Sequence, residues 1–374
     1  MSNGPHEVHD GDGRNIDPGV GRLEGEASQQ RVAADREDAK GAVAFDVFED
    51  VPSRYGGART ERSYYDRPTI KEPVWIWAVP AYFYVGGAAG AAAVLGAVAQ
   101  AVDRIALATL VKRCRWIAAT GSAAGAGLLI HDLGRPERFL NMLRVFRPTS
   151  ALNVGSWILA ASVSVSVTSA VLSGPGALRA LGDAAGYGAG LVGMPLSGYT
   201  AVLLSDTAVP LWQETRRTLP PLFVVSALSS AASLLQLGSL SEKEERIVER
   251  LGVAGKLCVL VAMLVLERDA SRVETVAEPL HEGSGGSLWK SAKVLTAAGV
   301  AGSVFLRGGP VKRVAAPTLA TAGALALRFA VFHAGKASSR DPRATASQQR
   351  AGHGAKEVTR TSAVVGSGER RAVT

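Results

Sequence analysis

Long apolar segments separated by short polar connections make up the middle of the chain. About eight windows are mostly apolar and long enough for a helix to cross a hydrocarbon core of about 30 Å. They lie near residues 74–100, 115–131, 151–173, 186–205, 220–240, 251–266, 290–306 and 315–334. The pattern predicts an all-α integral membrane protein of the cell membrane with about eight transmembrane helices.

The two ends of the chain differ from this apolar middle. Residues 1–72 and 336–374 are polar and charged, and they bring the mean hydropathy down to +0.14. Segments of this composition bury too little apolar surface to fold by themselves. We therefore expect a disordered tail over 1–72, a transmembrane bundle over 73–335 and a second disordered tail over 336–374.

Small residues recur four positions apart inside the apolar segments, which predicts close helix packing in lipid. The pairs are Gly86 and Gly90, Gly121 and Gly125, and Gly186 and Gly190.

Aromatic residues gather at the start of the first segment, where amphipathic rings favour the water boundary. They are Trp75, Trp77, Tyr82, Phe83 and Tyr84. Pro80 lies among them and removes a backbone hydrogen bond, which predicts a kink or unwound first turns.

Composition excludes several classes of function. The net charge of +8 comes from basic residues next to the apolar segments, which indicates membrane topology rather than nucleic-acid binding. Two cysteines are too few for an iron–sulfur cluster, which takes about four thiolates. A haem held by two histidines would need both of them inside the bundle. Of six histidines, only His131 and His333 lie as close to the apolar segments as their ends, so we expect no haem. No nucleotide loop, hydrolase triad or metal-site spacing occurs, so we expect no metal.

The connection from His131 to Ser150 is long and specifically charged. It reads HDLGRPERFLNMLRVFRPTS and contains Arg135, Arg138, Arg144 and Arg147. A simple turn between helices needs only a few small polar residues, so this loop indicates a role in docking a partner or binding a ligand. The alternative is a cytoplasmic loop that is basic only because of the positive-inside rule.

Polar groups near the ends of the apolar segments are candidates for ligand binding. Asp206 follows Tyr199 by seven residues, which places both on one helix face. A quinone ring needs hydrogen-bond donors, a proton acceptor and apolar walls. Tyr199 and Asp206, together with His131 and Asp132, have this chemistry. Alternatively, Asp206 is solvated at the interface and Asp132 acts only at a helix end.

Arg328 lies well inside the last apolar segment, too deep to reach water, so we expect it to meet a carboxylate or backbone carbonyls. Asp206 and Glu267 are the first carboxylates to consider. Lys256 and Glu267 lie near the ends of the sixth segment and are expected to extend to the interface.

The same segments resemble the NrfD/PsrC family, the membrane subunits of polysulfide-reductase-like molybdoenzyme complexes. The resemblance covers most of residues 74–345. It is carried by WIWAVPAYFYVGGAAGA, LLIHDLGRPERFLNMLRVFRPTSALNVGSWILAA, PLSGYTAVLLSDTAVPLW, LPPLFVVSALSSAA and LRFAVFHAGKASSRDPRAT. The stretch DLGRP in the charged loop is the most specific of these motifs.

The resemblance implies eight helices in two four-helix halves, without haem, that bind menaquinone or ubiquinone near one membrane face. An iron–sulfur subunit would dock over that face and connect it to a molybdopterin catalytic subunit. The motif residues His131, Asp132, Arg135 and Tyr199 would lie at or near the quinone pocket and docking surface. Tyr82, in the matching first segment, is a further candidate for quinone contact.

Two departures from the family pattern affect this expectation. Relatives often have Ser-Pro-Met-Ser after the arginine-rich loop, where this chain has Ser150, Ala151, Leu152 and Asn153. The start of the first segment is mostly aromatic, where some relatives place polar quinone contacts. The expected function is a quinone-interacting membrane anchor, non-catalytic or quinone-reacting, of an oxidoreductase complex. The alternatives are a proton or solute transporter and a passive anchor without quinone binding.

Overall fold

The computed structural model describes residues 16–17, 22–23 and 70–350, except 134–136, 175 and 307–308. The side chains of residues 16–17, 22–23, 137–138, 310–311 and 348–350 are outside this description. The chain divides into two units, Met1–Arg62 and Ser63–Thr374. In the first unit, strands β1 (Ile16–Asp17) and β2 (Arg22–Leu23) pair antiparallel, with Ile16 opposite Leu23. Most of the expected N-terminal tail and residues 351–374 lie outside the described residues.

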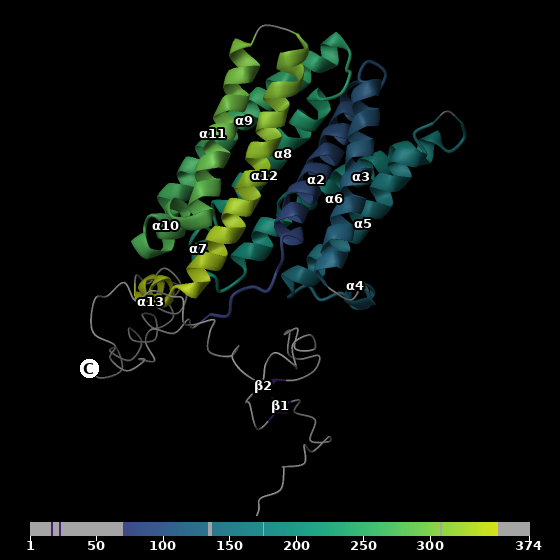
Figure 1. Ribbon diagram of the computed structural model, residues 1–374. Coiled ribbons are helices and arrows are strands. Elements are labelled where there is room, and N and C mark those ends of the chain that lie inside the picture. Colours follow the sequence, from purple (N-terminus) through teal and green to yellow (C-terminus); the bar gives the residue numbers. More distant parts are fainter. Residues whose placement is uncertain are drawn as a thin grey trace, which may run out of the picture. The chain divides into compact units, whose positions relative to one another are not determined.

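The described part of the second unit is helical. Its long helices run side by side and alternate in direction (Figure 1). They are α2 (Ala78–Asp103), α3 (Ala108–Asp132), α5 (Ala151–Val171), α6 (Arg179–Ser205), α8 (Leu219–Gln236), α9 (Glu242–Ala270), α11 (Gly283–Phe305) and α12 (Pro310–Arg340). Short helices connect or follow them: α4 (Glu137–Met142), α7 (Pro210–Glu214), α10 (Glu274–His281) and α13 (Pro342–Arg350). Each predicted apolar segment overlaps one long helix.

Five of these helices are long and apolar enough to cross a membrane: α2, α5, α6, α8 and α12. The segments predicted over α3, α9 and α11 form helices too, but polar and charged residues near their ends lower their hydropathy. That these three also cross the membrane stays a prediction.

Close approach at glycine holds the helices together, as the four-residue spacing predicts. Helix α2 packs against α3 and α6, and α5 also packs against α3 and α6. Helix α8 contacts α2, α6, α9 and α12. A Cβ added at Gly90 would lie 2.6 Å from the carbonyl oxygen of Gly193. A Cβ at Gly190 would lie 2.4 Å from the Cβ of Ala97. The prediction of tight packing at these glycines is confirmed.

The first helix begins later than its apolar pattern predicts. Residues 70–76 are not helical, and α2 starts at Ala78. Pro80 therefore falls in the first turn, where its missing N–H leaves no helical hydrogen bond unmade. The ring of Trp75 stacks on Trp212 of α7 with centroids 6.0 Å apart. This contact fixes the segment before the helix against the end of the bundle.

The last long helix also extends past the expected boundary at residue 335. Helix α12 continues to Arg340 and α13 follows it. Glu72 binds Lys336 at 2.9 Å and the Nε of Arg340 at 2.5 Å. Burial raises the pKa of Glu72, but the hydrogen bonds and charges of Arg340 and Lys336 outweigh burial and hold it below its ordinary value. These ion pairs join the segment before α2 to the end of α12, so the first described residues and residues 336–340 belong to the folded unit.

Candidate functional site

Two tyrosines meet inside the bundle, near the end where α2 begins and α6 ends. The hydroxyl groups of Tyr82 on α2 and Tyr199 on α6 are 2.7 Å apart. Tyr82 is 1% exposed and Tyr199 is 9% exposed. A pair of hydroxyls carries two protons, and the bond between them uses one. The second proton therefore remains available for a hydrogen bond to another acceptor.

Glycines make room for both tyrosine rings. A Cβ at Gly155 of α5 would lie 2.1 Å from Cε2 of Tyr199, and one at Gly86 would lie 2.9 Å from Cε2 of Tyr82. On α3, a Cβ at Gly125 would lie 3.1 Å from the Tyr82 ring. Three helices thus fit their backbones against the ring faces, and this close contact fixes the positions of the hydroxyls.

His131 and Asp132 lie at the end of α3, on the same side of the bundle. His131 is exposed, and its ring faces Trp77 with centroids 6.2 Å apart. Asp132 is half-buried, and its Oδ1 accepts a hydrogen bond of 3.0 Å from the backbone N–H of Ile76. The carboxylate of Asp132 thus holds the segment before α2, in agreement with the helix-end role considered from sequence. Among the described residues, no hydrogen-bond partner is found for its second oxygen, Oδ2. Their proposed part in proton uptake stays a prediction.

The charged loop after α3 is held by Asn153, in the first turn of α5. Asn153 accepts from the backbone N–H of Arg147 at 2.7 Å and donates to the carbonyl oxygen of Met142, also at 2.7 Å. Ser150 caps α5 by accepting from the N–H of Asn153. Asn153, which departs from the family pattern, therefore still anchors the loop to the helix.

Two arginines of this loop, Arg144 and Arg147, are exposed to solvent. Arg135 and the side chain of Arg138 lie outside the described residues. At the end of α6, Asp206 is the C-terminal cap and is exposed, whereas Tyr199 is buried. No hydrogen bond or ion pair joins Asp206 to Tyr199 among the described residues, so the structure does not bring these two candidates into direct contact.

Arg328 of α12 is 1% exposed, and its side chain packs against α8. Its Nη2 donates to the carbonyl oxygen of Phe223 at 2.9 Å, and its guanidinium lies 3.7 Å from the centroid of the Phe223 ring. The cation is thus held by a carbonyl and an aromatic face, two partners that suit a guanidinium in an apolar interior. The two carboxylates considered from sequence lie elsewhere: Asp206 is exposed, and Glu267 binds Lys293 at 2.5 Å.

Lys256 does not extend to the interface as expected from its position. It is fully buried, and its Nζ donates to Ser303 of α11 at 2.7 Å. The hydroxyl of Ser303, which is itself buried, offers the ammonium group an acceptor inside the bundle. Ser303 also lines an open cavity of about 520 Å³ together with Glu249 and Lys312, which bind each other at 2.6 Å.

At the opposite end of α2, α3, α5 and α6, Arg115 anchors a polar network that the sequence did not predict. Its Nη2 donates to Asp183 at 2.8 Å and to Gln100 at 2.7 Å, and its Nη1 donates to Ser173 at 2.9 Å. Arg104 forms a second ion pair with Asp183. The sequence feature that could have indicated this network is a pair of opposite charges, Arg115 and Asp183, each about one or two turns inside its helix.

The family model described as Polysulphide reductase, NrfD, matches residues 67–338. This chain belongs to the NrfD family. NrfD proteins are membrane-integral subunits of polysulfide-reductase-like oxidoreductase complexes, and the resemblance identified from the sequence motifs is confirmed. No curated protein and no solved structure matched the chain. The NrfD chain is therefore a multi-pass membrane protein, in agreement with its five apolar helices.

Proposed function

We propose that this NrfD chain is the quinone-reacting membrane anchor of a molybdoenzyme-type oxidoreductase. It exchanges electrons between menaquinone or ubiquinone in the membrane and an iron–sulfur subunit docked over the end of the bundle that holds Tyr82 and Tyr199. The iron–sulfur subunit in turn connects to a molybdopterin catalytic subunit. Membership of the NrfD family supports the role as a membrane subunit of such a complex.

The observation that carries the quinone proposal is the buried pair of tyrosine hydroxyls. A quinone has two carbonyl oxygens, and each accepts a hydrogen bond. The free proton of the Tyr82–Tyr199 pair is a donor of this kind, held in an apolar setting by rings packed against glycine. A neutral donor suits a neutral ligand, because binding then separates no charges in the membrane.

Oxidation of a quinol releases two electrons and two protons, and reduction of a quinone takes up the same number. The electrons pass to or from the iron–sulfur subunit, since this chain has too few cysteines to hold a cluster. His131 and Asp132 lie at the end of α3, next to the start of α2, and are candidates to exchange the protons with water. Asp206, exposed at the end of α6, is a third candidate.

The arginine loop is the proposed docking surface. Arg144 and Arg147 are exposed beside the start of α5, where α4 and Asn153 hold the loop. Arg135 and Arg138 belong to the same loop. Arginine forks bind carboxylates with defined geometry, so this surface fits an acidic face on the iron–sulfur subunit.

We also propose that all eight long helices span the membrane as two four-helix halves. Helices α2, α3, α5 and α6 contact one another, as do α8, α9, α11 and α12. Contacts of α2 and α6 with α8, and of α2 with α12, would join the halves. The tyrosine pair then belongs entirely to the first half.

The quinone site is tested by replacing Tyr199 with Phe in the intact complex. We expect quinol-linked turnover to fall at least about tenfold, because the variant removes one hydroxyl of the pair. Dye-linked turnover of the soluble subunits should remain unchanged. Tyr187→Phe is the matched control, since Tyr187 lies on the same helix but is 45% exposed. Equal quinol-linked turnover in Tyr199→Phe and wild type would contradict the proposal.

The docking surface is tested by reversing charge at two exposed arginines together, as Arg144→Glu and Arg147→Glu. We expect the purified membrane subunit to lose most of its associated iron, and the loss to increase with salt. Lys112→Glu is the control, because Lys112 is exposed on α3 at the opposite end of the bundle. Full iron content in the double variant would show that the partner docks elsewhere.

A proton or solute transporter is the second candidate, and buried Lys256 beside the 520 Å³ cavity favours it. Purified chain in lipid vesicles would then show uptake that depends on Lys256 and needs no quinone. A passive anchor is the third candidate, and it predicts that Tyr199→Phe leaves quinol-linked turnover unchanged. Quinol-linked turnover and uptake therefore separate all three.

A further inference from the structure

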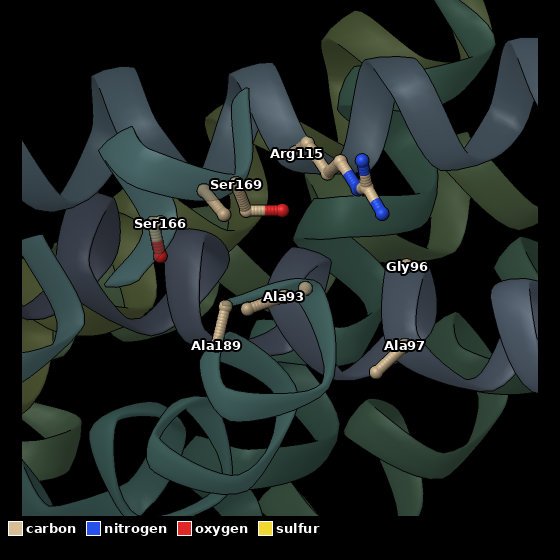
Figure 2. Close-up of a pocket in the computed structure, with 9 residues that line it drawn as sticks. Ala93, Gly96, Ala97, Arg115, Ser166, Ser169 and Ala189 are labelled. Carbon is tan, nitrogen blue, oxygen red and sulfur yellow. The ribbon is translucent and has the colours of Figure 1, made fainter. Parts of the chain in front are cut away.

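A small cavity of about 10 Å³ lies among α2, α3, α5 and α6, close to the Arg115 network (Figure 2). Most of its lining is small and apolar. Polar side chains come only from three of the lining residues, which are Arg115, Ser166 and Ser169. This cavity is remote from the Tyr82–Tyr199 pair and plays no part in the proposed quinone site.

Two buried polar atoms on these side chains have no partner among the described residues. They are Nε of Arg115 and Oγ of Ser169. Arg115 is 7% exposed and Ser169 is fully buried. The other two nitrogens of the Arg115 guanidinium are bonded, to Ser173 and to Gln100 and Asp183. Three of the five N–H donors are thus used, and Nε is the one guanidinium nitrogen that has no partner among the described residues.

Gly186 of α6 keeps the space beside these atoms open. A Cβ at this position would lie 2.7 Å from Oε1 of Gln100, 2.9 Å from Nη2 of Arg115 and 3.2 Å from Oγ of Ser169. Polar atoms from α2, α3 and α5 therefore converge on a point of α6 that has no side chain. In Figure 2 the hydroxyl of Ser169 points toward the side of the cavity where Arg115 lies.

A buried donor and a buried acceptor left unpaired would each cost about 1–3 kcal/mol. In the hydrocarbon region, such groups find partners inside the protein or in bound water. A cavity of roughly 10–15 Å³ on this measure holds one water molecule, provided that it has two or more polar partners. The cavity is too small for a larger ligand.

We propose that this cavity binds one water molecule. The water accepts a hydrogen bond from Nε of Arg115 and donates one to Oγ of Ser169, and Ser166 is its third polar neighbour. It extends the Arg115 network, which already joins α2, α3 and α6 through Gln100 and Asp183, deeper along α5. The water thereby helps to fix the spacing of the four helices at the end opposite the tyrosine pair.

The direct test is a high-resolution electron cryomicroscopy map of the full chain, with its co-purified subunits, in lipid nanodiscs. We expect a density peak within hydrogen-bonding distance of both Nε of Arg115 and Oγ of Ser169. An empty cavity in a map that resolves other buried waters would overturn the proposal. So would a Ser169 rotamer that bonds Arg115 directly.

A pair of variants supplies an independent readout. Ser169→Ala removes one partner of the water and should lower the melting temperature by a few degrees, with loss of the density peak. Ser164→Ala is the matched control, because Ser164 lies on the same helix, is exposed, and its hydroxyl donates to the backbone carbonyl of Ala160. Equal melting temperatures for the two variants would count against the water. If Ser169→Ala fails to assemble, the wild-type map alone decides.

Discussion

The helices α2, α3, α5 and α6 are joined in different ways at their two ends. Near one end, Tyr82 and Tyr199 share a neutral hydrogen bond, and glycines fit around their rings. Near the other end, Arg115 and Arg104 bind Asp183, with Gln100 and Ser173 satisfying further atoms of the network.

In the proposed function, this difference separates the end of the bundle that stabilises the fold from the end that binds quinone. A buried ion pair leaves an uncompensated charge when either partner is lost, so it resists rearrangement. A pair of neutral hydroxyls can open to admit a neutral ring without creating a bare charge. We therefore expect substitutions at the Arg115 end to lower stability, and substitutions at the tyrosine end to affect quinone reactions more than folding.

The largest effect is expected for Arg115→Leu. It removes the ion pair with Asp183 and the hydrogen bonds to Gln100 and Ser173, each of which leaves a polar group without its partner at about 1–3 kcal/mol. Because Arg104 still pairs with the half-buried carboxylate of Asp183, the ion pair itself contributes less than the about 3–5 kcal/mol of a fully buried pair. Thermal unfolding of the purified complex measures the loss. Lys112→Leu, on the same helix but exposed, should leave the melting temperature nearly unchanged. Similar melting temperatures for the two variants would show that the network adds little to stability.

A smaller effect is expected for Gly155→Ala. The added methyl would lie 2.1 Å from the Tyr199 ring, so the ring must move, and overpacking of this kind costs about 1–3 kcal/mol. The displaced hydroxyl should also reduce quinol-linked turnover. Gly127→Ala is the control, because a Cβ there meets nothing within 4 Å. Unchanged turnover in Gly155→Ala would indicate that the position of Tyr199 does not matter for the reaction.

The smallest effect is expected for Glu72→Gln, which breaks ion pairs outside the membrane. Partly exposed pairs contribute about 0–1 kcal/mol. Because the pKa of Glu72 is lowered in the folded protein, its contribution is present above its ordinary value of 4.5 and is lost as pH falls through the folded-state pKa. Wild type and Glu72→Gln should thus differ in melting temperature at neutral pH and converge in acid. A difference that grows as the pH falls would contradict this assignment.

Much of the helical architecture follows from hydrophobic pattern. Each predicted apolar segment overlaps a long helix, since runs of this length have few other ways to satisfy their backbone in lipid. The tyrosines were also accessible from sequence, because both lie in apolar segments near an expected membrane face. Their hydrogen bond was not, since 117 residues separate them and pattern gives no register between helices.

The Arg115 network was missed for a physical reason. Basic residues before residue 116 place the predicted start of the second segment near Arg115, whereas α3 starts at Ala108. Asp183 precedes the predicted fourth segment, although α6 starts at Arg179. Taken alone, Arg115 or Asp183 indicates the end of an apolar segment. Because the two residues form an ion pair, both can lie inside their helices in less polar surroundings. Pairing between distant residues is the information that a single sequence lacks.

In the proposed function, quinone reacts at the tyrosine end of the bundle. The most direct test is photolabelling of the intact complex in lipid with an azido-substituted quinone, followed by peptide mapping with and without excess quinone. We expect competed labelling on the peptides of α2 and α6 that contain Tyr82 and Tyr199. Competed labelling confined to other helices, such as those around Glu249 and Lys312, would contradict it.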